Sequence, residues 1–120
     1  MHFLLVDDES IVHETLRAFM HHLGHTSESA NNGINGQQAL LKKHYDAAFV
    51  DIRMPGMDGI SLLKWCRDAQ PHLAVVIMTG HGADVAREMA MRCGAYAFIE
   101  KPFSLRKIKQ LIKNIEARPK

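Results

Sequence analysis

The sequence has no long hydrophobic run, few cysteines and little net charge, and each shortage excludes a class of protein. Its longest apolar segment, residues 73–78, is far shorter than the ~20 residues needed to cross a membrane. Its cysteines, Cys66 and Cys93, lie on apolar faces of expected helices, which favours buried thiols over a disulfide. A net charge of +2 gives no reason to expect binding to nucleic acid or to an anionic membrane.

No signal peptide is evident, because Asp7 interrupts the first apolar run and no basic segment precedes it. No linker, repeat or low-complexity tract divides the sequence. The composition, 47% hydrophobic and 23% charged, is ordinary for a soluble globular protein. We therefore expect a single cytoplasmic domain that covers residues 1–120.

Apolar runs and helical periodicity alternate five times along the chain. The expected strands are residues 2–6, 26–30, 47–51, 73–78 and 96–99, and the expected helices are residues 10–23, 36–44, 59–68, 83–92 and 104–115. This alternation predicts an α/β fold, a parallel sheet with helices on both faces. The second strand is polar and belongs at an edge. Right-handed crossovers then favour a flavodoxin-like, doubly wound sheet of order 2-1-3-4-5.

Apolar spacing also predicts which side of each helix is buried. Ser104 is a suitable N-cap for the last helix. The expected buried faces of the last two helices are Ala86, Met89, Ala90 and Cys93, and Leu105, Ile108, Leu111, Ile112 and Ile115.

Polar residues stand where four of the strands end. Asp7 and Asp8 follow the first strand, Asp51 ends the third, Thr79 follows the fourth and Lys101 follows the fifth. Taken singly, each is ordinary as a turn, capping or surface residue. Because parallel strands end at one edge, the fold would bring them into one cleft.

Three carboxylates in one cleft repel one another unless a cation neutralises them. An oxygen-only donor set fits Mg²⁺. With a metal present, one carboxylate can act as a nucleophile toward a phosphoryl group. Lys101 would then share the phosphoryl charge, and Thr79 could donate a hydrogen bond to one of its oxygens.

Four motifs resemble the signatures of the response-regulator receiver domain, in order and over essentially the whole chain. They are Val6-Asp7-Asp8-Glu9-Ser10, the segment from Asp51-Ile52-Arg53 to Asp58-Gly59, Met78-Thr79-Gly80 and Lys101-Pro102-Phe103. The segments Met78-Thr79-Gly80-His81-Gly82 and Phe98-Ile99-Glu100-Lys101-Pro102 most resemble those of nitrogen-regulation and nitrogen-fixation transcription regulators.

The resemblance assigns roles to individual residues. It implies that Asp51 is the phosphoacceptor and that Asp7, Asp8, Asp51 and the backbone carbonyl of Arg53 bind Mg²⁺. It makes Thr79 and Phe98 the switch residues and Lys101 the phosphate-pairing residue, with a cis Lys101–Pro102 bond. Arg53 and His81 are expected to tune the lifetime of the phosphoryl group. Phe98 replaces the commoner tyrosine, so this position offers no phenol hydroxyl to a partner.

The implied function is a phosphorylation-controlled switch. A sensor histidine kinase would phosphorylate Asp51, and the surface formed by residues 83–92, the last strand and the last helix would contact an effector domain or a downstream protein. A phosphorylation-dependent homodimer stays open, although Gly94-Ala95-Tyr96-Ala97 lacks the acidic pair used for dimerisation in many DNA-binding regulators.

Two alternatives belong to other classes. An aspartyl phosphatase usually carries a second aspartate two residues after the first, where this chain has Arg53, so we do not expect an enzyme that turns over an external substrate. A degenerate receiver, which binds a partner without phosphorylation, is disfavoured by the complete set of site residues.

Overall fold

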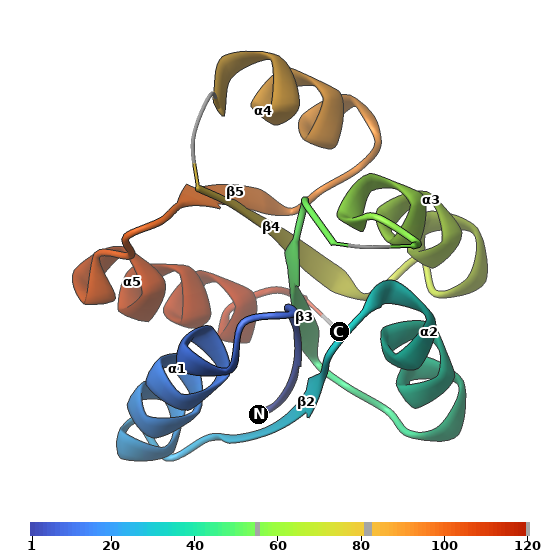
Figure 1. The fold of residues 1–120 in the computed structure, drawn as a ribbon. Coiled ribbons are helices and arrows are strands. Elements are labelled where there is room, and N and C mark those ends of the chain that lie inside the picture. The colour runs from blue at the N-terminus through green and yellow to red at the C-terminus, as the bar shows by residue number, and fades with distance from the viewer. Residues whose placement is uncertain (55, 81–82, 120) are drawn as a thin grey trace.

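One parallel sheet forms the centre of the computed structural model, which describes residues 1–54, 56–80 and 83–119 (Figure 1). Its strands are β1 (His2–Val6), β2 (Thr26–Ala30), β3 (Ala47–Asp51), β4 (Ala74–Thr79) and β5 (Ala97–Glu100). They pair in the order β2-β1-β3-β4-β5, all parallel. The predicted α/β fold and strand order are confirmed.

The helices cover both faces of this sheet. They are α1 (Ser10–His22), α2 (Gly33–Lys42), α3 (Gly59–Ala69), α4 (Ala83–Arg92) and α5 (Leu105–Glu116). Figure 1 shows α1 and α5 on one face and α2, α3 and α4 on the other. The core is divided in the same way, into two apolar clusters on opposite faces of the sheet.

Side-chain alternation along the strands explains the two clusters. Phe3 and Leu5 of β1 belong to the cluster beneath α1 and α5, whereas Leu4 and Val6 belong to the other. Every residue of β3 and β4 is buried, as expected for central strands covered on both faces. β2 is partly exposed along most of its length and lies at the edge, as its polar sequence predicts.

Helix α2 begins at Gly33, three residues before the predicted start at Gly36. The side chain of Asn32 accepts a hydrogen bond from the backbone N–H of Asn35, at 2.8 Å, and caps the helix. The predicted start was wrong because residues 31–33, Asn-Asn-Gly, also favour a turn, and an asparagine in a turn caps helices well. The predicted N-cap of α5 is confirmed, since the hydroxyl of Ser104 accepts from the Lys107 N–H at 3.4 Å.

Two of the predicted buried positions are wrong. Met89 is 49% exposed and Leu105 is 44% exposed. In α4 the sheet is contacted through small residues, with Ala90 fully buried, and Met89 lies about 100° around the helix from Ala90. Leu105 is the first residue of α5, where the helix is covered least.

The cysteines are free, as predicted, but only Cys66 is buried; Cys93 is partly exposed. Burial raises the pKa of the Cys66 thiol to about 11, which makes it unreactive at neutral pH. Within the described residues, every helix is too short or too polar to pass through a lipid bilayer.

Candidate functional site

The carboxyl-terminal edge of the sheet brings the predicted site residues together around Lys101. The Lys101 Nζ lies 2.8 Å from Asp7 Oδ2 and 3.5 Å from Asp51 Oδ1. It also donates to Glu9 Oε1 at 3.2 Å. Side chains from the ends of β1, β3 and β5, far apart in the sequence, therefore share one ammonium group.

Two carboxylates of this site are unusually buried, whereas those of Asp8 and Glu9 are exposed. Asp7 has no exposed surface and Asp51 is 5% exposed. Burial, together with the negative charge of Asp7, raises the pKa of Asp51 to about 6, although Lys101 and a backbone hydrogen bond from Arg53 act in the opposite direction. Burial lowers the pKa of Lys101, but its hydrogen bond to Asp7 and the charges around it outweigh this, and its pKa is raised overall.

Four acidic residues gather at this edge. One carboxylate oxygen from each of Asp7, Asp8, Glu9 and Asp51 lies within 4.8 Å of the others. A single ammonium cannot neutralise four carboxylates, so the cluster keeps an excess of negative charge. The donor set, oxygen only and strongly negative, fits a hard divalent cation such as Mg²⁺.

Glu9 is a member of the site that the sequence analysis did not include. Its position gives the signal that could have identified it, because it is the third consecutive acid after β1. Its backbone N–H also donates to Asp7 Oδ1 at 2.9 Å. Glu9 thus helps to orient Asp7 and adds a carboxylate of its own.

Thr79, the last residue of β4, holds a hydroxyl without a partner. Its side chain is 1% exposed, and Oγ1 forms no hydrogen bond with any described residue. A buried polar group left in this state costs about 1–3 kcal/mol. The backbone N–H of Lys101 donates to the Thr79 carbonyl oxygen at 2.7 Å, so the two side chains are held at the same edge. A ligand with acceptor oxygens would satisfy this hydroxyl.

Phe98 lies in the middle of β5 and is 8% exposed. The guanidinium carbon of Arg87, from α4, lies 5.6 Å from the centre of its ring. The Lys101–Pro102 peptide bond is cis, as predicted. His81 lies outside the described residues, so its predicted place beside the site stays a prediction.

The loop after β3 returns closely over the end of that strand. Asp58 caps α3 by accepting from the Ser61 N–H at 2.8 Å. A Cβ at Gly59 would meet the Asp51 carbonyl oxygen and would lie 2.7 Å from the Ile52 Cα. Glycine is therefore required for α3 to begin against the strand that carries Asp51.

Known proteins resemble this chain in sequence and in structure. The family model of the response regulator receiver domain matches residues 3–113. The DNA-binding transcriptional regulator NtrC of Escherichia coli (strain K12) is 39% identical over 101 residues, which cover 84% of this chain and 22% of NtrC. The regulatory protein AtoC of the same strain is 35% identical over 109 residues, covering 91% of this chain and 24% of AtoC.

Two solved structures have the same fold. The receiver domain of NtrX from Brucella abortus superposes with a TM-score of 0.91 at 30% identity, covering 97% of this chain and 99% of that one. A response regulator receiver domain protein from Clostridium thermocellum gives a TM-score of 0.90 at 27% identity, covering 95% and 92%. The chain spans about a quarter of the length of NtrC and AtoC.

Proposed function

The chain belongs to the response regulator receiver domain family, and from this premise we propose that it is a switch controlled by phosphorylation of Asp51. The observation that carries the proposal is the unsatisfied Thr79 hydroxyl, which is held at the same edge as the Lys101 ammonium and the buried Asp51 carboxylate. Such a set provides a nucleophile together with a cation and a hydrogen-bond donor for phosphoryl oxygens.

The proposed chemistry is a transfer to the Asp51 carboxylate. An Asp51 oxygen attacks the phosphorus, an aspartyl phosphate forms, and the bond from phosphorus to the donor breaks. Lys101 and Thr79 contact the phosphoryl oxygens as the group arrives. We propose a sensor histidine kinase as the physiological donor, as is usual for this family.

Asp7, Asp8, Asp51 and the backbone carbonyl of Arg53 would hold Mg²⁺, with Glu9 close by. Bound there, Mg²⁺ supplies positive charge for the carboxylates and for the phosphoryl oxygens. Lys101 remains the protein's own cation at the site. Arg53 and His81 are proposed to tune the rate at which the aspartyl phosphate is hydrolysed.

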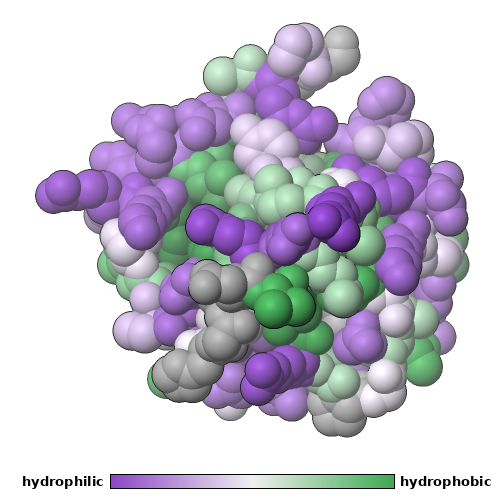
Figure 2. Space-filling view, turned by 90° about the horizontal axis from the view of Figure 1, so that it is seen from above, coloured by the Kyte–Doolittle hydropathy of each residue, from purple (hydrophilic) through white to green (hydrophobic). Residues whose placement is uncertain are grey.

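The proposed output runs through Thr79 and Phe98. When Thr79 bonds to the phosphoryl group, the end of β4 shifts and Phe98 repacks beneath Arg87. The surface that changes is formed by α4, β5 and α5. Seen from the α4 side, this part of the molecule mixes hydrophobic and hydrophilic side chains (Figure 2), and Val85, Met89 and Met91 of α4 are exposed.

An effector domain or a downstream protein is the proposed partner for the α4–β5–α5 surface. Support comes from the relatives, since NtrC is a DNA-binding transcriptional regulator about four times longer than the matched part. Exposed apolar side chains on α4 are suited to an interface. A phosphorylation-dependent contact between two copies would use the same side chains.

The test is the intact mass of the chain after incubation with Mg²⁺ and acetyl phosphate. We expect a gain of one phosphoryl group that is absent without Mg²⁺ and absent in Asp51→Asn. Asp58→Asn serves as a matched control, because Asp58 caps α3 outside the acidic cluster. No gain in the wild type would favour the degenerate receiver, and a gain that persists in Asp51→Asn would identify another acceptor.

A further inference from the structure

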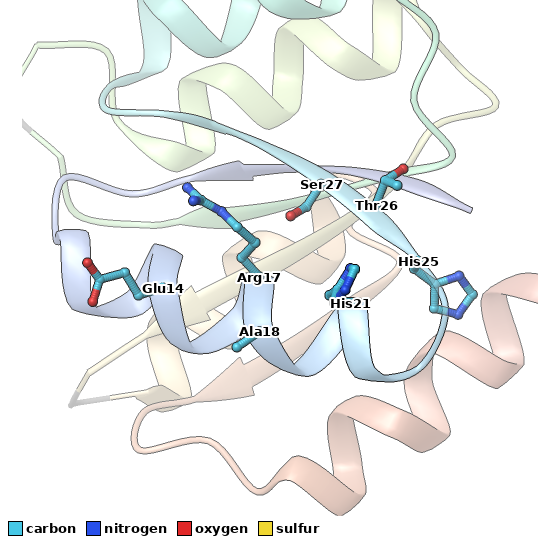
Figure 3. A pocket seen from close by; sticks show the side chains of 7 residues that line it. All are labelled: Glu14, Arg17, Ala18, His21, His25, Thr26 and Ser27. Atoms are coloured by element: carbon cyan, nitrogen blue, oxygen red, sulfur yellow. The ribbon is translucent and has the colours of Figure 1, made fainter.

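A second hollow lies between α1 and the edge strand β2 and shares no residue with the acidic site (Figure 3). Its volume is about 390 Å³, within the range of small-molecule sites. It is lined by Glu14, Arg17, Ala18, His21, His25, Thr26 and Ser27. Nothing in the proposed phosphorylation switch uses these side chains.

Arg17 brings an uncompensated positive charge to this hollow. Its guanidinium makes a single hydrogen bond, 3.4 Å from Nη2 to the hydroxyl of Ser29. Arg17 is exposed, and among the described residues it has no ion pair, even though Glu14 lies one helical turn before it. A guanidinium carries five N–H donors, so most of them remain available to a ligand.

Ser27 provides an unsatisfied hydroxyl beside this charge. Ser27 pairs with Phe3 in the sheet, and Phe3 belongs to the cluster beneath α1, so its side chain turns toward α1. The Ser27 Oγ is buried and forms no hydrogen bond with any residue of the described chain. A buried hydroxyl is normally paired, and the open hollow is the place from which a partner could come.

Helical spacing places the remaining groups. Arg17 and His21 are one turn apart on α1, and Ala18 between them is small enough to leave space. Figure 3 shows Arg17, His21 and Ser27 turned toward the same hollow, with His25 pointing away. His25 is already engaged, since its Nε2 lies 3.6 Å from the Glu116 carboxylate.

We propose that this hollow binds a small organic anion through a carboxylate or phosphate group. The guanidinium of Arg17 binds the anionic group, and the Ser27 hydroxyl donates a hydrogen bond to one of its oxygens. His21 lines the same side of the hollow. Glu14, one helical turn before Arg17, repels a second negative charge beside the first. The site therefore selects ligands with one anionic end. This proposal does not depend on phosphorylation of Asp51.

The experiment is a ¹H–¹⁵N NMR titration of the chain at neutral pH in the absence of Mg²⁺. Sodium acetate and sodium phosphate are the probes, each compared with sodium chloride at equal ionic strength. We expect saturable shifts at the amides of His21 and Ser27 and at the side-chain N–H of Arg17 with at least one probe. Chloride should give none. Saturation by acetate alone or by phosphate alone assigns the ligand's anionic group.

Three variants separate the site from general salt effects. Arg17→Gln should weaken the apparent affinity by about tenfold or more, because a charged hydrogen bond is lost. Ser27→Ala should weaken it by a smaller factor. Arg106→Gln, which removes an exposed arginine of α5, should leave it unchanged.

Absence of saturation with both probes would overturn the proposal, as would shifts that persist unchanged in Arg17→Gln. Phosphorylation by acetyl phosphate should be unaffected in Arg17→Gln, which also shows that the variant is folded. Failure of this site and failure of the Asp51 switch are thus distinguishable.

Discussion

Polar clusters stand at both ends of the same strands, and they are built in opposite ways. At the amino-terminal end, the Glu28 carboxylate accepts from His2 at 2.6 Å, from Lys43 at 3.1 Å and from the Tyr45 hydroxyl at 3.2 Å. At the carboxyl-terminal end, three carboxylates, those of Asp7, Glu9 and Asp51, share Lys101, and the Thr79 hydroxyl has no partner among the described residues.

The pKa values record this difference. The hydrogen bonds from His2 and Lys43 lower the pKa of Glu28, whereas burial and Asp7 raise the pKa of Asp51 to about 6. The first carboxylate is stabilised in its charged form by the fold, and the second is destabilised. The amino-terminal carboxylate is therefore compensated by its neighbours, whereas the carboxyl-terminal cluster keeps an excess of negative charge and, among the described residues, an unpaired hydroxyl.

The largest expected effect on stability comes from replacing Asp51, whose buried carboxylate is destabilised in its charged form. The pKa of Asp51 is raised from 3.8 to about 6, so its contribution to stability is present below pH 4 and is lost as the pH rises through 6. Asp51→Asn should therefore raise the free energy of unfolding at pH 7.5, without Mg²⁺, by about 3 kcal/mol.

Urea denaturation of both proteins at pH 4 and pH 7.5 measures this effect. At pH 4 the two should differ little, because the wild-type carboxyl is then protonated. An equal difference at both pH values would contradict the proposed cause.

Mg²⁺ should have nearly as large an effect, and only at the carboxyl-terminal cluster. A ligand that binds only the folded state stabilises it by about 2.7 kcal/mol at a hundred times its Kd. We expect the midpoint temperature of thermal unfolding of the wild type to rise with Mg²⁺ and to return to its original value when a chelator is added. Asp7→Asn should lose most of this response, whereas Glu28→Gln should keep it. A full response in Asp7→Asn would place the ion elsewhere.

A matched pair of threonine substitutions compares the two ends directly. Thr26 Oγ1 lies 2.6 Å from His2 Nδ1, whereas Thr79 Oγ1 is unpaired within the described part of the chain. Thr26→Val should destabilise the protein by up to about 1 kcal/mol, and Thr79→Val should be neutral or stabilising by a similar amount. Chemical denaturation measures the stability of both variants. A Thr79→Val variant less stable than Thr26→Val would contradict the proposed difference between the two ends.

The smallest effect is expected at Glu28, which is 38% exposed at its side chain and therefore screened by solvent. Its pKa is lowered, so its contribution is present above pH 4.5 and is lost as the pH falls below that value. Glu28→Gln should cost less than about 1 kcal/mol at pH 7. The difference should shrink in denaturation curves as the pH falls below 4.5; a difference that grows there would be inconsistent with this sign.

The sequence was sufficient to predict the strands and to predict that their carboxyl ends meet at one edge of the sheet. Apolar runs that stop at Asp7, Asp51 and Thr79 identify strands and site residues at once, because a parallel sheet aligns those ends. Burial is harder to predict. Nothing in the sequence separates Asp7, which is fully buried, from Asp8, which is exposed.

Contacts between side chains that are far apart in the sequence could not be predicted from it either. Arg67 of α3 donates to the Gly94 carbonyl oxygen at 3.0 Å and to that of Leu73, and a Cβ at Gly94 would lie 2.6 Å from the Arg67 Cδ. Gly94 has a φ of 96°, as expected of a glycine that follows a helix. Its second role depends on a side chain that is nearly thirty residues away, which periodicity cannot show.

The polar edge strand β2 has a consequence for how copies of the chain meet one another. Its backbone could form hydrogen bonds with an arriving strand, but the side chains of Thr26, Ser27, Glu28 and Ser29 give that strand almost no apolar surface to bury. Strand-to-strand polymerisation at this edge is therefore unfavourable, even in a crowded solution. The large apolar side chains that are exposed in the described chain lie on the helices instead, among them Ile11, Leu41 and Val85.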